Sequence, residues 1–281
     1  MKIIATPKEL KEYLCYMKNP NELDNEQTIG FVPTMGALHE GHLSLIKEAK
    51  KNNDIVVVSI FVNPTQFSKD EDLDKYPRNI DADKKICEIC KVDVLFLPCT
   101  DNIYNKDEVS VNAPNVRGYV LEGFTRPTHF SGVLTVVNKL LNIVNPTRAY
   151  FGKKDAQQLN LINLMVKHLF MNVEIVPIDT VRDSDGLALS SRNIYLSKDE
   201  RVDALKIPSS LKLASDMVAK GELNSKNIIK KMRENFADIE IFYIEIVDRE
   251  FNKIDDVEIG NTIILVEVKV GTTRLLDNFW L

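Results

Sequence analysis

Two histidines and two glycines lie close together in a short polar run, Pro33 to His42, which reads Pro-Thr-Met-Gly-Ala-Leu-His-Glu-Gly-His. His39 and His42 are three residues apart, so on the first turn of a helix their side chains would share one face. Gly36 and Gly41 lack a Cβ atom, so a ligand can come close to the backbone there. Paired imidazoles could stabilise charge on such a ligand, and a structural histidine pair at a helix start is the alternative.

The flanking residues indicate how this run is positioned. An apolar segment, Ile29 to Val32, precedes it, and apolar residues at helical spacing, from Leu43 to Ala49, follow it. The expected local structure is a strand, a tight turn and a helix that begins near Glu40 to His42. Open α/β sheets bind ligands outside the carboxyl ends of their strands. A helix N-terminus there offers free N–H groups and a positive dipole end, which suit phosphate.

Three other loops carry polar side chains that could complete the site. Gln66 follows a β-branched segment, Asp54 to Val62, and its amide could fix a small polar substrate, with a solvated turn glutamine as the alternative. In Gly152-Lys153-Lys154-Asp155 a lysine could place a mobile charge on phosphates, while Asp155 could cap the next helix. In Leu189-Ser190-Ser191-Arg192 hydroxyls and a guanidinium could grip phosphate, with a solvated surface turn as the alternative.

The composition excludes several classes of protein. The chain has 281 residues, 44% hydrophobic and 27% charged, as expected of a globular protein with room for two domains. Its net charge of −5 argues against a broad nucleic-acid-binding surface. No apolar run approaches the roughly 20 residues of a membrane span, and no signal peptide is evident, so the cytoplasm is the expected location. Cys87 and Cys90 form a C-x-x-C without a second pair, which favours reduced cysteines over a zinc or redox site.

Strands and helices alternate over residues 1–182, which predicts an α/β domain, a Rossmann-like parallel sheet with helices on both faces. Over residues 183–281 helices precede two alternating, antiparallel strands, which predicts a smaller, lid-like α+β domain. The expected strands cover residues 29–32, 54–62, 92–97, 149–151, 173–181, 239–247 and 262–270, with a short outlying strand at 109–111. The expected helices cover residues 7–18, a segment from about 40, and residues 78–91, 132–144, 155–170, 197–221 and 225–236. The acidic run at 70–74 is expected to be solvated.

The spacing His-x-Gly-His after a strand resembles the signature of the nucleotidylyl-transfer superfamily. The complete run from Pro33 to His42 resembles, more specifically, the pantoate–β-alanine ligase (pantothenate synthetase) family. Further segments fit the same family in the same order: Val-Ser-Ile-Phe-Val-Asn-Pro-Thr-Gln-Phe at 58–67, Arg-Pro-Thr-His-Phe at 126–130, Gly-Lys-Lys-Asp at 152–155, Leu-Ser-Ser-Arg-Asn at 189–193 and Thr-Arg-Leu-Leu-Asp-Asn at 273–278. Lys153 departs from the family pattern, which has glutamate there, and we expect its side chain to face outward.

This resemblance implies a role for each matching residue. The implied ATP-binding residues are Met35, Gly36, Ala37, Leu38, His39, Glu40, Gly41, His42, Gly152, Lys153, Lys154, Asp155, Val181, Leu189, Ser190, Ser191 and Arg192. The implied pantoate-binding residues are Gln66, Gln158, Arg126 and His129, and Gln66 would also contact β-alanine. His42 would be the proton donor, with His39 and Lys154 as further catalytic residues. Mg²⁺ would be held mostly by ATP phosphates, with Asp83 as the candidate protein ligand.

By the same resemblance, the reaction joins pantoate to β-alanine at the expense of ATP through a pantoyl adenylate and releases AMP and pyrophosphate. The expected partners are these three small substrates and a second copy of the chain in a homodimer, with no redox cofactor, nucleic acid or membrane. The alternatives are a nucleotidyltransferase with another small acceptor, a tRNA-binding synthetase fragment, which the net charge disfavours, and a non-catalytic nucleotide sensor.

Overall fold

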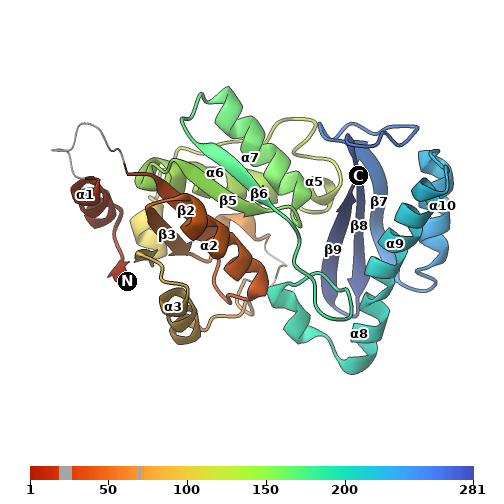
Figure 1. The fold of residues 1–281 in the computed structure, drawn as a ribbon, viewed down its shortest axis with the longest axis horizontal. Coiled ribbons are helices and arrows are strands. Elements are labelled where there is room, and N and C mark those ends of the chain that lie inside the picture. Colours follow the sequence, from red (N-terminus) through yellow and green to blue (C-terminus); the bar gives the residue numbers. More distant parts are fainter. Residues whose placement is uncertain (19–26, 69–70, 72) are drawn as a thin grey trace.

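The computed structural model describes residues 1–18, 27–68, 71 and 73–281 (Figure 1). Six strands form a sheet in the order β1-β4-β3-β2-β5-β6, and every neighbouring pair is parallel. The strands are β1 (Lys2–Ile4), β2 (Ile29–Thr34), β3 (Ile55–Ile60), β4 (Val94–Phe96), β5 (Arg148–Gly152) and β6 (Glu174–Ile178). The predicted Rossmann-like parallel sheet is thus confirmed, with β1 as an edge strand that the sequence analysis missed.

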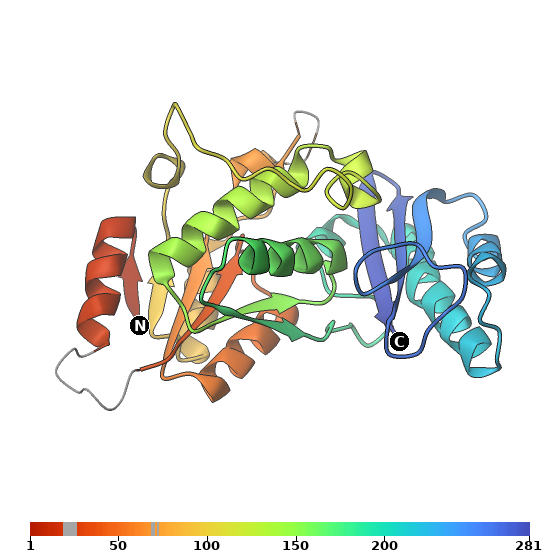
Figure 2. The same cartoon turned by 90° about the horizontal axis from the view of Figure 1, so that it is seen from above.

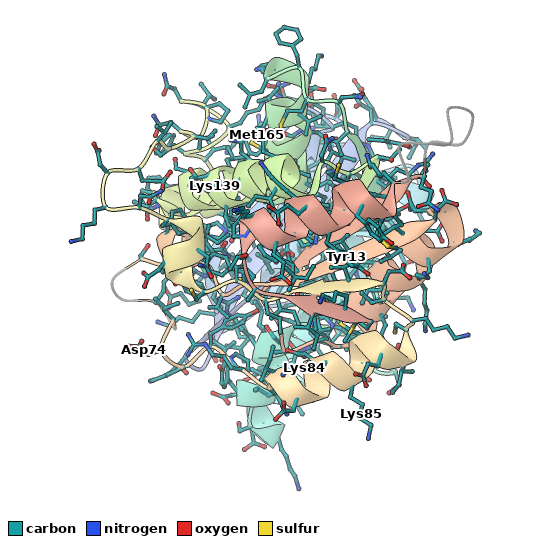
Figure 3. The ribbon with its side chains drawn as sticks, turned by 90° about the vertical axis from the view of Figure 1, so that its left-hand side faces the viewer. Tyr13, Asp74, Lys84, Lys85, Lys139 and Met165 are labelled. Atoms are coloured by element: carbon teal, nitrogen blue, oxygen red, sulfur yellow. The ribbon has the colours of Figure 1, made fainter. Side chains whose placement is uncertain are left out.

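Helices cover both faces of this sheet (Figures 1 and 2). One face packs against α1 (Pro7–Met17), α6 (His129–Val144) and α7 (Ala156–His168), and the other against α2 (Glu40–Asn52) and α3 (Ile80–Ile89). Figure 3 shows α1 and α6, with Tyr13 and Lys139, on one side of the sheet and α3, with Lys84 and Lys85, on the other.

The central strand β3 explains why both faces are covered. Ile55 and Val57 belong to the apolar cluster beneath α1, α6 and α7, whereas Val56 and Val58 belong to the cluster beneath α2 and α3. Successive side chains of a strand point to opposite faces, so a continuous apolar run gives a strand that is buried on both sides. The prediction for this segment is therefore confirmed.

A second sheet is antiparallel and has the order β7-β8-β9. Its strands are β7 (Glu240–Asp248), β8 (Thr262–Val270) and β9 (Thr273–Trp280). The helices α8 (Lys198–Ala204), α9 (Lys206–Ala219) and α10 (Ser225–Glu234) share an apolar cluster with these strands and lie beside them in Figure 1. The predicted small α+β unit is confirmed, β9 was not predicted as a strand, and the boundary at residue 182 stays a prediction.

Two expected elements are wrong in detail. Residues 109–111 form no strand, because Val111 exchanges hydrogen bonds with the Thr135 hydroxyl of α6 instead of pairing with a strand. The single helix expected over 197–221 is two helices, since Pro208 has no N–H to donate to Ala204 and therefore lies in the first turn of a new helix. The expected end of the first helix, at residues 19–21, lies outside the described residues.

Short helices occupy several connections. They are α4 (Thr100–Ile103), α5 (Glu122–Thr125) and the 3₁₀ helices η1 (Pro64–Gln66) and η2 (Ser191–Tyr195). Within the described ranges, no helix has both the length and the apolar character that crossing a bilayer requires.

Candidate active site

Two loops meet where the strand order of the parallel sheet reverses. β3 and β4 lie on one side of β2, and β5 and β6 lie on the other. The loops that follow the neighbouring strands β2 and β5 therefore open into one crevice, the position at which such sheets bind ligands. The first loop carries His39 and His42, the second carries Lys154 and Asp155, and all four residues line a single cavity.

Most of the residues predicted to bind ATP or pantoate line this cavity. Those that do are Met35, His39, Gly41, His42, Gln66, Arg126, His129, Gly152, Lys154, Asp155, Gln158, Val181, Leu189, Ser190, Ser191 and Arg192. The predicted ATP-binding residues that do not line it are Gly36, Ala37, Leu38, Glu40 and Lys153.

The two histidines are held by backbone N–H groups at the start of α2. The Nδ1 atom of His39 accepts from the N–H of Gly41 at 3.2 Å, and Nδ1 of His42 accepts from the N–H of His39 at 3.3 Å. A ring nitrogen that accepts carries no proton, so in both neutral rings the hydrogen is on Nε2. The ring centroids are 4.2 Å apart. Each histidine can therefore donate one hydrogen bond from Nε2.

Burial keeps both imidazoles neutral. It lowers the pKa of His42 to about 3, helped by the adjacent His39, and it lowers the pKa of His39 to about 4, helped by Lys154. Asp155 opposes both shifts. Protonation would also place a hydrogen on Nδ1, directly against a backbone N–H. In the free protein the pair therefore consists of neutral hydrogen-bond donors and not of cations.

Lys154 and Asp155 form an ion pair in the second loop. The ammonium nitrogen of Lys154 lies 3.2 Å from Oδ1 of Asp155. Burial alone would raise the pKa of Asp155, but Lys154 and Arg192 bring the pKa below its ordinary value, so this carboxylate is ionised. Lys154 is thus a cation at the carboxyl end of β5, where it can move as a point charge from Asp155 to a phosphate.

Tyr76 organises the serine-rich segment on the same cavity. The Ser191 hydroxyl lies 3.2 Å from the Tyr76 hydroxyl and donates to it, and the guanidinium carbon of Arg192 lies 5.8 Å from the centre of the Tyr76 ring. Ser190 accepts the N–H of Arg192 at 3.3 Å and so starts η2. The carbonyl of Val181 accepts the N–H of Leu189, which joins this segment to the end of the sheet.

Asp83, the candidate magnesium ligand, contacts the backbone of the turn after β2. Its carboxylate is buried, accepts the N–H of Ala37 at 2.9 Å and that of Leu38 at 2.8 Å, and does not line the cavity. Ala37 has φ of 51°, in the left-handed region that side chains disfavour, so these bonds hold the turn between β2 and α2. The geometry favours a structural function for Asp83. The described residues contain no group of three or more His, Cys, Asp or Glu side chains that could hold a metal ion.

Gln66 reaches the cavity with a fixed amide. Its Oε1 accepts from Nδ2 of Asn63 at 3.1 Å, and its Nε2 lies 3.0 Å from the sulfur of Met35. Asn63 is itself held, because Tyr104 donates its hydroxyl to Oδ1 of Asn63 at 2.8 Å. Because a thioether is only a weak acceptor, Nε2 of Gln66 can donate its hydrogen bond to a substrate oxygen instead.

Arg126 lines the cavity and uses four of its five N–H donors inside the protein. Its guanidinium donates two hydrogen bonds to Glu71, at 2.6 and 2.7 Å, one to Glu122 at 2.8 Å and one to the carbonyl of Gln66 at 3.3 Å. His129 Nδ1 lies 2.9 Å from the same carbonyl, which can only accept, so Nδ1 is the donor. Arg126 and His129 therefore hold the main chain of Gln66.

Glu71 departs from the expectation that the acidic run at 70–74 is solvated, of which residues 70 and 72 lie outside the described residues. Its side chain is only 13% exposed, and Nη2 of Arg274 on β9 lies 2.8 Å from its Oε1. Burial would raise the pKa of Glu71, but Arg126 and Arg274 lower that pKa to about 2. Glu71 thus joins the substrate side of the cavity to the second sheet.

Glu267 on β8 adds a buried acid to this group. The side chain is fully buried, and neither carboxyl oxygen has a hydrogen-bond partner among the described residues, although Nε of Arg274 lies 3.3 Å from Oε1. Burial raises the pKa of Glu267 to about 8, with Glu122 and Glu71 adding to the shift and Arg274 and Arg126 opposing it. Burial thus favours the protonated form of Glu267.

Lys153 and Glu40, in the segments expected to bind ATP, direct their side chains to ion-pair partners. Lys153 forms an ion pair with Asp179 at 2.6 Å and lies over the Trp280 ring, 5.6 Å from its centre. Glu40 is exposed and lies 4.0 Å from the ammonium of Lys47. Neither side chain lines the cavity.

Sequence reasoning missed several residues of the site. Those that line the cavity are Asn63, Tyr76, Glu122, Asp179, Thr180, Asn193, Arg274 and Asp277. Asn63 and Asn193 lie in segments that had already been singled out, and Asp179 and Thr180 fall at the end of an expected strand, so position at or after a strand end was the available signal for these four. Arg274 and Asp277 come from β9, and the signal for them was the resemblance of residues 273–278 to the family pattern.

A His-x-Gly-His turn that opens a helix at the switch point of a doubly wound parallel sheet, facing a lysine loop, defines a nucleotide-binding protein of the nucleotidylyl-transfer class. Residues 2–280 match the family model described as pantoate-beta-alanine ligase. The chain is 62% identical to the pantothenate synthetase of Sulfurimonas denitrificans over the full length of both proteins, and 58% identical to that of Aliarcobacter butzleri over 90% of this chain and 93% of the relative. This chain belongs to the pantoate–β-alanine ligase family.

Solved structures agree with this assignment. The pantothenate synthetase of Thermus thermophilus matches with a TM-score of 0.91 and 36% identity over 99% of both chains. The pantoate–β-alanine ligase of Francisella tularensis, in complex with β,γ-ATP and β-alanine, matches with a TM-score of 0.79 and 38% identity over 100% of this chain and 97% of the other.

Proposed function

We propose that this protein joins pantoate to β-alanine in an ATP-dependent reaction that releases AMP and pyrophosphate. The observation that carries the proposal is the convergence of His39, His42 and Lys154 with Gln66 and Gln158 on one cavity at the switch point. The Francisella tularensis relative, which holds an ATP species together with β-alanine, supports the same pair of ligands here.

In the first step a carboxylate oxygen of pantoate attacks the α-phosphorus of ATP. The bond from that phosphorus to pyrophosphate breaks, and pantoyl adenylate forms. Negative charge develops on the α-phosphate oxygens and on the leaving pyrophosphate. The Nε2–H groups of His39 and His42, the ammonium of Lys154 and the N-terminus of α2 would stabilise it, and their position around one cavity supports this role.

In the second step the amine of β-alanine attacks the pantoyl carbonyl carbon. The new carbon–nitrogen bond is the amide, AMP leaves with the electron pair of the broken bond, and the amine loses a proton. No protein nucleophile is needed, because the adenylate already carries the activation. The protein contributes placement and electrostatic stabilisation.

Two side-chain amides would hold pantoate and β-alanine in the cavity. Gln66 offers its Nε2 donor there, and Gln158 lines the same cavity one turn into α7. Arg126 and His129 would act on pantoate indirectly, by holding the carbonyl of Gln66. This arrangement suits a small hydroxy acid.

Mg²⁺ would enter as the counter-ion of ATP. The described side chains do not fit a protein-held magnesium centre, because they include no group of three or more His, Cys, Asp or Glu that could hold a metal ion, and both oxygens of Asp83 serve the turn after β2. Magnesium keeps several waters and is commonly bound through substrate phosphates. We assign no step to a metal held by the protein.

We further propose that the protein works in the cytoplasm as a homodimer, with residues 1–182 and 183–281 as its two domains. The two sheets and their separate apolar clusters support the division. Sedimentation equilibrium would test the dimer.

A pyrophosphate-release assay tests the proposed reaction. With ATP, pantoate and β-alanine, release should be continuous and should match AMP formation. Without β-alanine it should stop after a burst of about one equivalent, and without pantoate it should not occur. Continuous release without pantoate, or with another acceptor in its place, would refute the proposed substrates.

A further inference from the structure

The last strand of the second sheet contacts the phosphate-side lysine loop through one buried side chain. Asn278 on β9 is only 3% exposed, and its Nδ2 donates to the carbonyl oxygen of Lys153 at 2.9 Å and to that of Lys154 at 2.6 Å. These two hydrogen bonds use both N–H hydrogens of the amide. They join strand β9 to the loop that follows β5.

The orientation of the Asn278 amide is itself determined. Its Oδ1 accepts the indole N–H of Trp280 at 2.7 Å, so the oxygen and nitrogen of the amide cannot be exchanged without losing all three bonds. The backbone N–H of Asn278 donates to Oδ1 of Asp277 at 2.8 Å. Asp277 accepts two hydrogen bonds from Arg182, at 2.5 and 3.0 Å, so the same strand end also holds the segment after β6.

The contact fixes the direction of two peptide groups. The N–H of Lys153 already donates to the carbonyl of Ile178 in β6, which holds the first half of the loop. Asn278 draws the next two carbonyls toward β9. Because the chain has no cis peptide bond in the described ranges, the N–H groups of Lys154 and Asp155 point away from β9.

This direction matters for an anionic ligand. A carbonyl oxygen carries partial negative charge, so a carbonyl turned toward a triphosphate would repel it, whereas an N–H group would attract it. The Lys154 side chain leaves the backbone between these two fixed peptide groups. Its ammonium can be delivered to the same place in each catalytic cycle only if that backbone stays in place.

We infer that Asn278 is a positioning residue for Lys154, and that β9 thereby sets the phosphate side of the active site. The inference rests on the proposed function, since it assigns Lys154 to the phosphates of ATP. Asn278 does not line the cavity and is not expected to touch a substrate.

The test compares Asn278→Leu with wild type and with a matched control. Leucine has a similar size and no charge, so it removes the two donors without adding an electrostatic effect on ATP. The control is Asn235→Leu, because Asn235 donates its amide to the carbonyl of Lys206 at 3.0 Å and neither of these two residues lines the cavity. Calorimetric titration with ATP and with pantoate, and the rate of the pyrophosphate burst, are measured for each protein.

Asn278→Leu should weaken ATP binding about tenfold and slow the burst about 10- to 100-fold, the range expected when a catalytic group is misplaced by about 1 Å. Pantoate affinity should stay within about twofold of wild type, and Asn235→Leu should change the affinity for neither ATP nor pantoate. If the leucine variant does not fold, Asn278→Ser replaces it, because the serine hydroxyl can still donate one hydrogen bond. This variant should show the same selective loss of ATP affinity and burst rate, with a smaller magnitude.

Unchanged ATP affinity and burst rate in the folded Asn278 variant would overturn the inference. So would an equal loss for ATP and pantoate, or an equal loss in Asn235→Leu, because a merely structural asparagine would give those results. A different result would overturn the proposed function: a wild-type protein that gives no pantoate-dependent pyrophosphate burst.

Discussion

The histidine pair should stay neutral at a pH where ordinary histidines are charged. A histidine with the usual pKa near 6.5 is about 97% protonated at pH 5. With pKa values of about 3 and about 4, His42 and His39 would be only about 1% and about 10% protonated at that pH. Nuclear magnetic resonance of ¹⁵N-histidine-labelled protein measures this directly, with the two signals assigned by single substitutions.

We expect both signals to show a protonated Nε2 and an unprotonated Nδ1 from pH 8 to pH 5. The folded-state pKa lies below the unfolded value, so the unfolded chain binds more protons in this range. Stability should therefore fall as the pH drops below 6.5, by about 1.4 kcal/mol per pH unit for His42 and by less for the partly exposed His39. A His42 signal that titrates between pH 6 and 7, or one that carries its hydrogen on Nδ1, would refute the reasoning.

Further substitutions test the other parts of the site. His42→Ala should slow pantoyl-adenylate formation about 100-fold or more, the scale of one lost charge-stabilising donor, and a near-normal burst would contradict this. Gln66→Ala should raise the KM of pantoate and β-alanine with ATP affinity kept, so calorimetry that shows lost ATP affinity alone would contradict the assignment. Burial raises the pKa of Glu267 to about 8 from 4.5, so the free energy of unfolding of the wild type should fall as the pH rises through this range. Urea titrations at pH 6 and pH 8.5 should show this loss in the wild type but not in Glu267→Gln. The same pH dependence in both proteins would show that Glu267 is not protonated. Gly132→Ala would place a Cβ atom 2.3 Å from the carbonyl oxygen of Thr65 and should destabilise the fold by about 1–3 kcal/mol, and an unchanged urea midpoint would count against this packing.

The central architecture could be predicted because its signals are local. A continuous β-branched run gives a buried strand, and alternation with helical spacing gives a parallel sheet. Loops that follow neighbouring parallel strands must then open on the same edge. The convergence of His39, His42 and Lys154 on one cavity follows from that rule once β2 and β5 are known to be neighbours, which is a feature of the sheet order and not of the chain order.

The contacts between the two sheets could not be predicted in the same way. Arg274 meets Glu71 across 203 residues, and Asn278 meets the carbonyl of Lys154 across 124 residues. No period or turn signal encodes such pairs, because they depend on how the second sheet packs against the first. For this reason an acidic run that was expected to be solvated instead supplies the largely covered Glu71 side chain.

Side-chain roles within a predicted loop were also beyond the sequence. Asp83 and the turn at Ala37 lie far apart in the chain, and an aspartate near a phosphate site fits a metal ligand as well as a backbone acceptor. Arg126 fits a substrate carboxylate by charge, yet Glu71 and Glu122 already neutralise it. Charge pattern alone does not show which partner lies within hydrogen-bonding distance.

The order of the two chemical steps is the central claim, and isotope exchange between labelled pyrophosphate and ATP tests it most directly. We expect label to enter ATP when pantoate is present and β-alanine is absent, because the adenylate forms reversibly before the amine reacts. Exchange that requires β-alanine, or that proceeds without pantoate, would contradict the account.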